Sequence, residues 1–368
     1  MTWHLFVLVW GNVFVERFAR LVVPFLAMPG NVPALAADDK VIFHVYSDAA
    51  SRAGLATALA PLAAYCTVDI RTFDDAAARR FSGAQYRYEL QRWCLRDLAR
   101  SISEGSLVLL DSNFIPSNGT LAHLAAQRAN GYRAACVTFV RAATARLDAA
   151  LSPCLADGAP IDGRGLFTIA TASLHHITES FFVDAAPFTT YPSQILWRAG
   201  AAGFVARNFL PHPLMIPVSD ALQRSQSTMD YDLALRLASD DVIYVGHDSD
   251  DMLLVKFSDE DHHAERDGAP APTLDQIGLF LLTCTNHRHR LFANVPAAFH
   301  GGGRDAAFEA AALQSQRLID DAYGWIDQVA AQAGRLDARL LMYLKSHLGP
   351  IEDFMSPQLE PSALGRLP

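Results

Sequence analysis

Short apolar segments alternate with longer amphipathic segments along most of the chain. The runs at 5–10, 41–46 and 106–110 are almost continuously apolar, as in strands that are covered on both faces. We predict strands at 5–10, 41–46, 67–71, 106–110, 134–140 and 242–245, and helices at 13–28, 53–63, 86–102, 121–128, 231–238, 306–332 and 337–347. Strands that alternate with helices in this way favour a parallel sheet with right-handed crossovers.

Turn-forming residues mark the ends of several predicted elements. Asn12 is placed to begin the first long helix, and Pro29 and Gly30 are placed to end it. The segment 259–272 is strongly polar and contains proline, which indicates a loop, and the tail from 350 is expected to be loosely ordered. The pattern therefore predicts an α/β fold with a helical C-terminal region.

The composition supports a large buried core. Of the 368 residues, 51% are hydrophobic and 19% are charged, and the mean hydropathy is +0.13. The formal net charge of −9 argues against a nucleic-acid partner held by a global basic field. Five cysteines are scattered without a C-x-x-C pair, which favours free thiols in a reducing compartment over disulfides.

The apolar N-terminus is not expected to be a signal sequence or a membrane anchor. Basic residues do not precede the run, and Gly11, Asn12 and Glu16 interrupt it. Apolar runs elsewhere in the chain are shorter than the roughly 20 residues that cross a bilayer. We therefore expect a cytoplasmic protein without a transmembrane segment.

Asp111, Ser112 and Asn113 follow the segment that most resembles a buried strand. Ligands in open α/β sheets bind at the carboxyl ends of such strands. Two side-chain oxygens two residues apart could bind one Mg²⁺ or Mn²⁺ ion that bridges a diphosphate. An Asx-type turn uses the same residue types, so a metal site and a turn both remain open here.

Further acidic residues follow the predicted strand 242–245. Asp248, Asp250 and Asp251 would repel one another unless a cation or a positive side chain neutralised them, and a solvated acidic turn is the alternative. Asp230 and Asp232 lie at a predicted helix start, where the helix dipole favours carboxylates. Capping is the stronger explanation for this pair.

Other histidines and glycines give weaker evidence of a functional role. At most one of the adjacent His175 and His176 is expected to be functional, and a lone His212 before proline is more often structural. The glycines at 301–303 precede a helix and favour a flexible joint over a phosphate cradle. The sequence contains no G-x-x-x-x-G-K-[ST], G-x-G-x-x-G after a strand, G-x-S-x-G or H-E-x-x-H motif, so the corresponding kinase, dehydrogenase, serine-hydrolase and metalloprotease readings lose support.

Several blocks between residue 1 and about 260 share features with one group of proteins. They include V-W-G-N-V-F-V-E-R-F at 9–18, L-L-D-S-N-F-I-P-S-N-G-T-L at 109–121, F-T-T-Y-P-S-Q-I-L-W-R at 188–198, G-F-V-A-R-N-F-L-P-H-P-L at 203–214 and V-I-Y-V-G-H-D-S-D-D at 242–251. Through these blocks the chain resembles poorly characterised bacterial proteins that look like GT-A-type glycosyltransferases.

This resemblance implies a Rossmann-type mixed sheet flanked by helices, a nucleotide-sugar donor, and Mg²⁺ or Mn²⁺ held by an Asp-x-Asp motif at a strand end. Asn113 and Asn118 stand where the group favours Asp, which lowers the expected metal affinity because an amide carries no charge. By the same resemblance, Asp111 and Asn113 face the donor diphosphate and share the metal with His212. The backbone at Trp10, Gly11 and Asn12 approaches the nucleotide.

The resemblance also suggests catalytic and acceptor residues. Asp230, Asp248 or Asp250 is the expected general base, and Arg207 and Arg288 are the expected basic partners of the diphosphate. Aromatic side chains at Tyr191 and Trp197 are candidates for the acceptor site, although core packing is the other role open to Trp197. The acceptor itself, whether glycan, lipid-linked or protein, is not indicated.

We therefore predict a GT-A-like catalytic domain at 1–300, with a nucleotide-binding half at about 1–120 and an acceptor half at about 121–300, followed by a helical extension at 301–368. The leading hypothesis is glycosyl transfer from a nucleotide sugar. A catalytically reduced glycosyltransferase-like binding protein and a metal-dependent phosphoesterase are the alternatives. A homodimer would suit the apolar composition.

Overall fold

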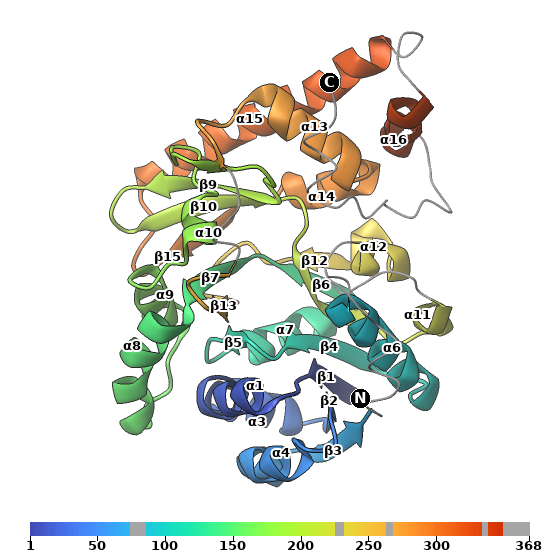
Figure 1. Cartoon of the computed structure of the whole chain (residues 1–368), viewed down its shortest axis with the longest axis vertical. Coiled ribbons are helices and arrows are strands. Elements are labelled where there is room, and N and C mark those ends of the chain that lie inside the picture. The colour runs from blue at the N-terminus through green and yellow to red at the C-terminus, as the bar shows by residue number, and fades with distance from the viewer. Residues whose placement is uncertain (74–85, 225–231, 263–267, 333–337, 349–368) are drawn as a thin grey trace. The chain divides into compact units, whose positions relative to one another are not determined.

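The computed structural model contains a seven-stranded mixed sheet whose strands lie between residues 2 and 245 (Figure 1). The structure describes residues 1–73, 86–224, 232–262, 268–332 and 338–348. The strand order is β12-β6-β11-β4-β1-β2-β3, and β11 runs antiparallel to both of its neighbours while the other pairs are parallel. The strands are β1 (Thr2–Leu8), β2 (Lys40–Ser47), β3 (Thr67–Thr72), β4 (Ser106–Asp111), β6 (Ala134–Val137), β11 (His212–Pro217) and β12 (Ile243–Val245).

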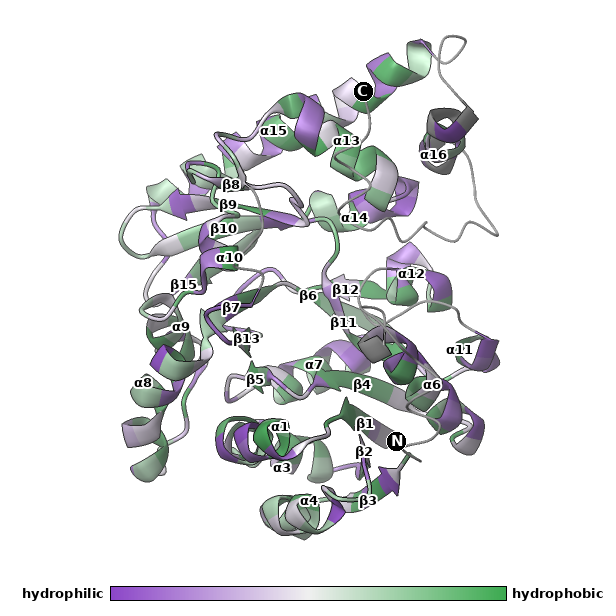
Figure 2. Cartoon of the chain, viewed as in Figure 1, coloured by the Kyte–Doolittle hydropathy of each residue, from purple (hydrophilic) through white to green (hydrophobic). Residues whose placement is uncertain are grey.

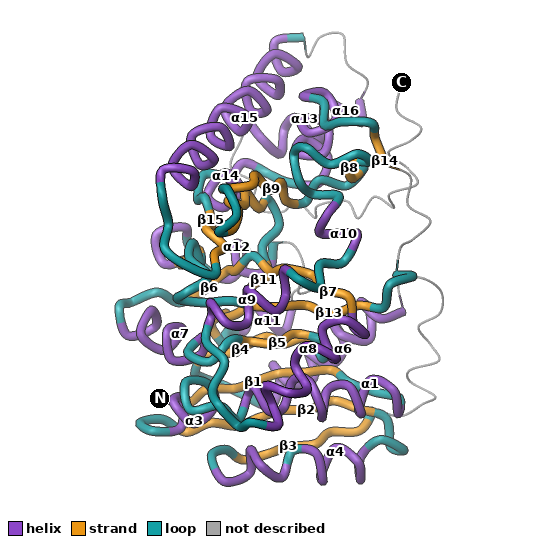
Figure 3. Tube along the Cα trace, turned by 90° about the vertical axis from the view of Figure 1, so that its left-hand side faces the viewer, coloured by secondary structure: helices purple, strands orange, loops and turns teal. Residues whose placement is uncertain are grey.

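The continuous apolar runs explain where the central strands lie. In β1 the six residues from Trp3 to Leu8 are buried, and in β4 the five residues from Ser106 to Leu110 are buried. Helices pack on this sheet: α3 (Val32–Ala36) contacts β2, and α6 (Tyr86–Ser101) contacts β1. Figure 2 shows these inner strands as largely hydrophobic, and Figure 3 shows β1, β2 and β3 side by side. The predicted mixed α/β sheet flanked by helices is confirmed.

The predicted first helix at 13–28 is interrupted. The structure has α1 (Asn12–Arg17), a π-helical turn (Phe18–Val22) and α2 (Val23–Leu26), with Pro24 in the first turn of α2. Proline has no N–H to donate, and its ring clashes with the carbonyl of the preceding turn. The α-helical hydrogen bonding therefore cannot continue unbroken through Pro24.

The predicted strand at 134–140 is two strands that belong to different sheets. β6 ends at Val137, and β7 (Phe139–Ala143) joins a second sheet of order β5-β13-β7. In this sheet β13 (Leu254–Ser258) pairs antiparallel with β5 (Phe114–Pro116) and parallel with β7. Since β5 begins three residues after β4 ends, the second sheet starts at the carboxyl end of β4.

Contacts within the chain define two compact units. Unit 1 comprises Met1–His175 and Pro211–Glu260, and unit 2 comprises His176–Leu210 and Asp261–Pro368. Both sheets described above belong to unit 1. The expected boundaries at 120 and 300 differ from these limits and remain a prediction about domain organisation.

Unit 2 combines a small antiparallel sheet with long helices. The sheet has the order β15-β10-β9, formed by β9 (Gln194–Ala199), β10 (Gly203–Asn208) and β15 (Ala297–His300). Helix α13 (Leu274–Cys284) packs on α15 (Ala306–Ala331), where a Cβ at Gly278 would lie 2.4 Å from Trp325 Cε3. This glycine therefore permits the close approach of the two helices.

Other helices and short strands complete the two units. In unit 1 they are α4 (Arg52–Ala58), α7 (Thr120–Ala129), α8 (Thr144–Ala156), α9 (Gly163–Thr171), α11 (Asp220–Arg224) and α12 (Leu233–Leu237); in unit 2 they are α10 (His176–Glu179), α14 (Arg290–Ala293), α16 (Ala338–Leu348), β8 (Phe188–Thr189) and β14 (Gly268–Ala269). Within the described ranges, no helix combines the length and the apolar character that crossing a membrane requires.

Candidate functional site

The order in which successive strands are added to the central sheet reverses between the parallel strands β1 and β4. β2 and β3 continue on one side of β1, and β4 lies on its other side, with Leu8 paired with Asp111 at the ends of the two strands. A crevice forms outside the carboxyl ends of the strands at such a reversal, because the following loops leave in opposite directions. We call the edge where β1, β2 and β4 end the carboxyl edge.

The loop after β1 is held by the first carboxylate after β2. Gly11 N donates to Asp48 Oδ2 at 2.8 Å, and Asp48 also accepts bonds from Ser51 N at 2.6 Å and Ser51 Oγ at 3.1 Å. Partial burial alone would raise the pKa of Asp48, but these bonds lower it overall. Gly11 has φ 79° and ψ 139°, a backbone conformation that residues other than glycine rarely adopt. This part of the loop is therefore tightly fixed.

Trp10 precedes Gly11 in this loop, and Asn12 follows it as the first residue of α1. The Trp10 ring meets Phe73 edge-on, with 6.4 Å between the ring centroids, and Asn12 is exposed. The three residues expected to approach a nucleotide thus lie at the carboxyl edge beside Asp111. Their role in binding remains a prediction.

Asp111 forms a partly buried ion pair with Lys256 of β13. Lys256 Nζ donates to Asp111 Oδ2 at 2.6 Å, and Gln91 Nε2 donates to Asp111 Oδ1 at 3.1 Å. The Lys256 side chain is 7% exposed and that of Asp111 is 18% exposed. The Lys256 ammonium also lies 4.8 Å from the ring centre of Phe114 and 5.3 Å from that of Phe139, within cation–π range.

Strand pairing places Lys256 at this position. β13 pairs with β5 so that Lys256 lies opposite Phe114, and β5 itself follows β4 after a two-residue connection. The sequence analysis did not identify Lys256. A single charged residue inside the apolar segment 252–257 was the available signal, because a lysine within a buried strand requires a partner.

Asn113 is bonded to the same strand. Its Nδ2 donates to the Phe257 carbonyl at 2.8 Å, and Phe257 N donates to the Asn113 carbonyl at 3.0 Å. Asn118 accepts a bond from Gly30 N at 2.8 Å. Both asparagines thus fix the backbone of neighbouring segments.

His212 is buried on β11. Its Nε2 lies 2.8 Å from the Leu109 carbonyl, to which it donates, and its ring meets Phe114 edge-on at 4.6 Å between centroids. This bond orients the imidazole along the sheet. The contacts support a structural role for His212.

The expected Mg²⁺ or Mn²⁺ site does not fit these residues. Asp111 is the one carboxylate of the predicted set Asp111, Asn113 and His212, and an ammonium group already contacts it at 2.6 Å. The Nδ2 of Asn113 donates to the Phe257 carbonyl and the Nε2 of His212 donates to the Leu109 carbonyl, so His212 Nε2 is not available to a metal ion. A divalent cation placed here would be repelled by Lys256 and would meet little negative charge.

One carboxylate of the acidic turn after β12 is neutralised by an arginine of α9. Asp250 makes a bidentate ion pair with Arg164, with the shortest contact from Nη2 to Oδ2 at 2.6 Å. Asp248 Oδ1 accepts a bond from Asp250 N at 2.9 Å. The sequence analysis considered a cation or a positive side chain as the group that neutralises these carboxylates. At Asp250 it is a positive side chain, that of Arg164. Asp230 lies outside the described residues.

Arg207 belongs to unit 2 and is buried there. It donates to Ser315 Oγ at 2.7 Å, the Ala293 carbonyl at 3.0 Å and the Ala312 carbonyl at 3.4 Å. Burial lowers the pKa of Arg207 to about 10. These bonds connect β10, α14 and α15, which is a structural role.

The other candidates in unit 2 also pack internally. Tyr191 meets Phe280 edge-on at 4.8 Å between ring centroids, and Trp197 is buried in β9. Arg288 lies in a 3₁₀ turn, His287–His289, where its backbone N–H is capped by Asn286. Core packing, the alternative considered for Trp197, agrees with its burial.

Basic residues surround the end of β13. Arg17 pairs with Asp259 at 3.0 Å, Arg146 pairs with Glu260 at 2.9 Å, and Arg141 donates to Ser258 Oγ. His175 Nε2 donates to the Asp259 carbonyl at 2.8 Å. These contacts draw basic side chains of α1, β7 and α8 to the segment that follows Lys256.

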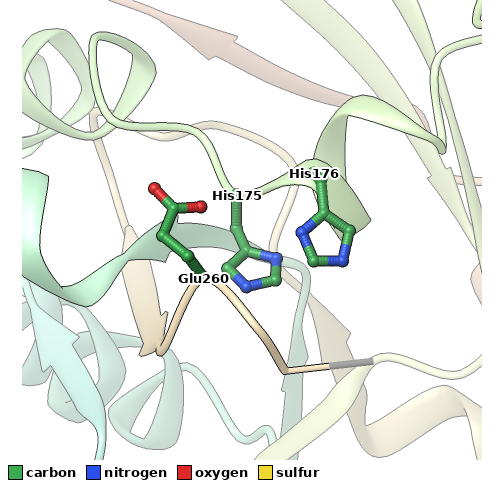
Figure 4. Close-up of side chains that lie close together, drawn as sticks. All are labelled: His175, His176 and Glu260. Atoms are coloured by element: carbon green, nitrogen blue, oxygen red, sulfur yellow. The ribbon is translucent and has the colours of Figure 1, made fainter. Parts of the chain in front are cut away.

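Figure 4 shows His175, His176 and Glu260. A ring nitrogen of His175 and a carboxylate oxygen of Glu260, both in unit 1, lie within 4.8 Å of each other. His176 is the first residue of unit 2. Since Glu260 pairs with Arg146 and His175 bonds to the Asp259 carbonyl, these contacts fasten the end of β13 to its neighbours.

No family model and no curated protein matches the chain. Among solved structures, apo mouse xyloside xylosyltransferase 1 is similar over 42% of this chain and 59% of its own length, with 13% identity and a TM-score of 0.28. S. aureus TarS is similar over 93% of this chain and 50% of its own, with 10% identity and a TM-score of 0.33. The similarity thus covers 59% of the first structure and 50% of the second, and TM-scores this low determine neither fold nor function.

Proposed function

We propose that the chain is a glycosyltransferase that binds a nucleotide-sugar donor at the carboxyl edge, beside Asp111. The observation that carries this proposal is the pairing of Leu8 with Asp111 where the strand order reverses, which brings the Gly11 loop next to a charged site. The sequence resemblance supports it, because two of the similar blocks, at 9–18 and 109–121, meet at this edge.

The proposed roles follow from position. The backbone at Trp10, Gly11 and Asn12 contacts the nucleoside, where Gly11 allows a close approach because it has no side chain. The exposed part of the Asp111 carboxylate accepts a hydrogen bond from a hydroxyl group of the nucleotide sugar. The positive charge of Lys256 faces the diphosphate, which is the leaving group.

The transfer step breaks the bond between the anomeric carbon of the sugar and a diphosphate oxygen. The electron pair stays on the nucleoside diphosphate, and fixed positive charge at the site stabilises it. The acceptor hydroxyl oxygen forms the new bond, and its proton passes to a base. We propose Asp248 for this role, because Asp250 is held by Arg164 and Asp248 follows β12 at the same edge of the sheet.

A thermal-shift panel of UDP-, GDP- and CDP-sugars tests the proposal. One donor is expected to raise the melting temperature progressively with its concentration, because it binds the folded state. Asp111→Ala is expected to abolish that shift, whereas Asp241→Asn, which alters an exposed carboxylate at the opposite end of β12, is expected to keep it. If every donor left the melting temperature unchanged, the proposed function would be wrong.

A binding protein that has lost transfer activity is the second candidate, and the Asp111–Lys256 ion pair favours it in one respect. The pair satisfies both charges without a substrate. Donor binding with no release of nucleoside diphosphate, with every acceptor offered, would select this candidate. A two-metal phosphoesterase receives no comparable support, because Arg164 already neutralises Asp250.

A further inference from the structure

We propose that Lys256 takes the place of a divalent cation at this site, so that the donor diphosphate is bound without metal. This inference rests on the proposed function, because it assigns the charge that meets the donor. Lys256 neutralises the leaving diphosphate, and Arg141, which is paired with Lys256 on the next strand, adds a second positive charge.

The charge at Asp111 is already balanced by a side chain. The 2.6 Å contact from Lys256 Nζ to Asp111 Oδ2 is as short as a charge-assisted hydrogen bond, and Gln91 bonds to the other oxygen. A metal ion bound to a carboxylate would occupy the same region. Lys256 therefore supplies positive charge at the position where a metal-dependent site would hold its ion.

The ammonium group is held in place from several sides. Its position is set by strand β13, and the rings of Phe114 and Phe139 lie 4.8 Å and 5.3 Å from it. The side chain is 7% exposed. A charge fixed in this way needs little reorganisation when charge develops on a leaving group, which is the condition for effective electrostatic stabilisation.

A second cationic side chain lies on the same face of the second sheet, β5-β13-β7, as Lys256. Lys256 is paired in parallel register with Arg141 of β7, so the two side chains project to the same side. The Arg141 guanidinium lies 6.0 Å from the Phe139 ring, which also contacts Lys256. With Asp111 counted, the three side chains carry one net positive charge, which favours a diphosphate and disfavours a divalent cation.

The diphosphate probe for this inference is UDP, GDP or CDP, titrated by calorimetry in EDTA and again with excess Mn²⁺. We expect one of them to bind with dissociation constants that agree within about twofold in the two buffers. Lys256→Met is expected to weaken binding at least tenfold, a loss of about 1.4 kcal/mol, and Lys256→Arg to restore part of it. Lys40→Met, the same change at an exposed lysine at the start of β2, is the matched control and is expected to have no effect.

Three outcomes separate the inference from the proposed function. Binding that is at least tenfold tighter with Mn²⁺ overturns the inference and leaves the proposed function standing, and so does a folded Lys256→Met variant with unchanged affinity. Failure of all three nucleotides to bind in both buffers overturns the proposed function as well. If Lys256→Met does not fold, Mn²⁺ titration of the nucleotide-bound wild type by electron paramagnetic resonance decides: one bound ion per chain contradicts the inference, and none supports it.

Discussion

Lys256 donates a hydrogen bond to Asp111 at 2.6 Å, although 145 residues separate them in the sequence. Two strand pairings produce this contact: β4 leads into β5, and β5 pairs with β13. The ion pair thus links the carboxyl edge of the seven-stranded sheet to the second sheet, β5-β13-β7.

A double-mutant cycle measures the strength of this pair. For Lys256→Met and Asp111→Asn we expect a coupling energy of about 2 kcal/mol in urea unfolding, because removal of one partner leaves a largely buried charge. The control cycle uses Arg198 and Asp184, whose side chains are both 59% exposed, and is expected to give roughly 0.5 kcal/mol or less. Equal coupling energies in the two cycles would contradict the conclusion that the Lys256–Asp111 pair is more buried than the Arg198–Asp184 pair.

Substitution of the two asparagines by aspartate is expected to have different effects. Asn113→Asp removes the donor to the Phe257 carbonyl and places two acceptors together, which lowers the free energy of unfolding by about 1–3 kcal/mol. Asn118→Asp keeps the acceptor for Gly30 N, and we expect a change of roughly 0.5 kcal/mol or less. Urea denaturation with and without Mn²⁺ measures both. Stabilisation of Asn113→Asp by Mn²⁺ would show that a metal site is latent here.

The conformation of the β1–α1 loop predicts opposite effects of alanine at two glycines. Gly11→Ala is expected to destabilise the protein by about 1–3 kcal/mol because of its positive φ. Gly54→Ala lies in α4, where the new Cβ has its nearest neighbour at 3.9 Å, and is expected to stabilise by about 0.5–1 kcal/mol. Thermal and urea unfolding give both values, and the same sign for the two variants would contradict the loop geometry.

Stability should also fall as the pH falls from about 6.5 to about 4. His44 Nδ1 donates to Asp69 at 2.9 Å, and its Nε2 lies 3.0 Å from Nδ1 of His4, whose Nε2 donates to the Glu104 carbonyl at 3.2 Å. Burial lowers the pKa of His44 to about 4 and also lowers that of His4. In this interval the unfolded chain binds more protons than the folded chain, so acidification favours unfolding.

The contribution of His44 to this pH dependence is about 3 kcal/mol, fully present above pH 6.5 and lost below about 4. His44→Gln is expected to reduce the drop in unfolding free energy between pH 7 and 4.5, whereas His247→Gln at an exposed histidine is expected to preserve it. Urea unfolding at several pH values checks this. A pH dependence that His44→Gln left unchanged would place the titrating group elsewhere.

The sequence predicted the central strands and the location of Asp111 because these depend on local apolar runs. It did not predict Lys256 as the partner of Asp111, since that contact depends on the register of β13 against β5. It also did not predict that Val137 and Phe139 enter different sheets, because a single apolar run does not show which strands will be its neighbours. The residue type of Arg207 predicted a ligand contact, whereas tertiary packing buries its side chain.

Release of nucleoside diphosphate from nucleotide sugars in EDTA, with water as the acceptor of the sugar, tests the central claim most directly. Wild type, Asp111→Asn, Lys256→Met and the control Asp241→Asn are compared on the full donor panel. The account predicts that wild type and Asp241→Asn release the diphosphate from one donor without added metal, and that Asp111→Asn and Lys256→Met each lose at least tenfold in rate. No release from any donor, or equal rates in all four proteins, would contradict it.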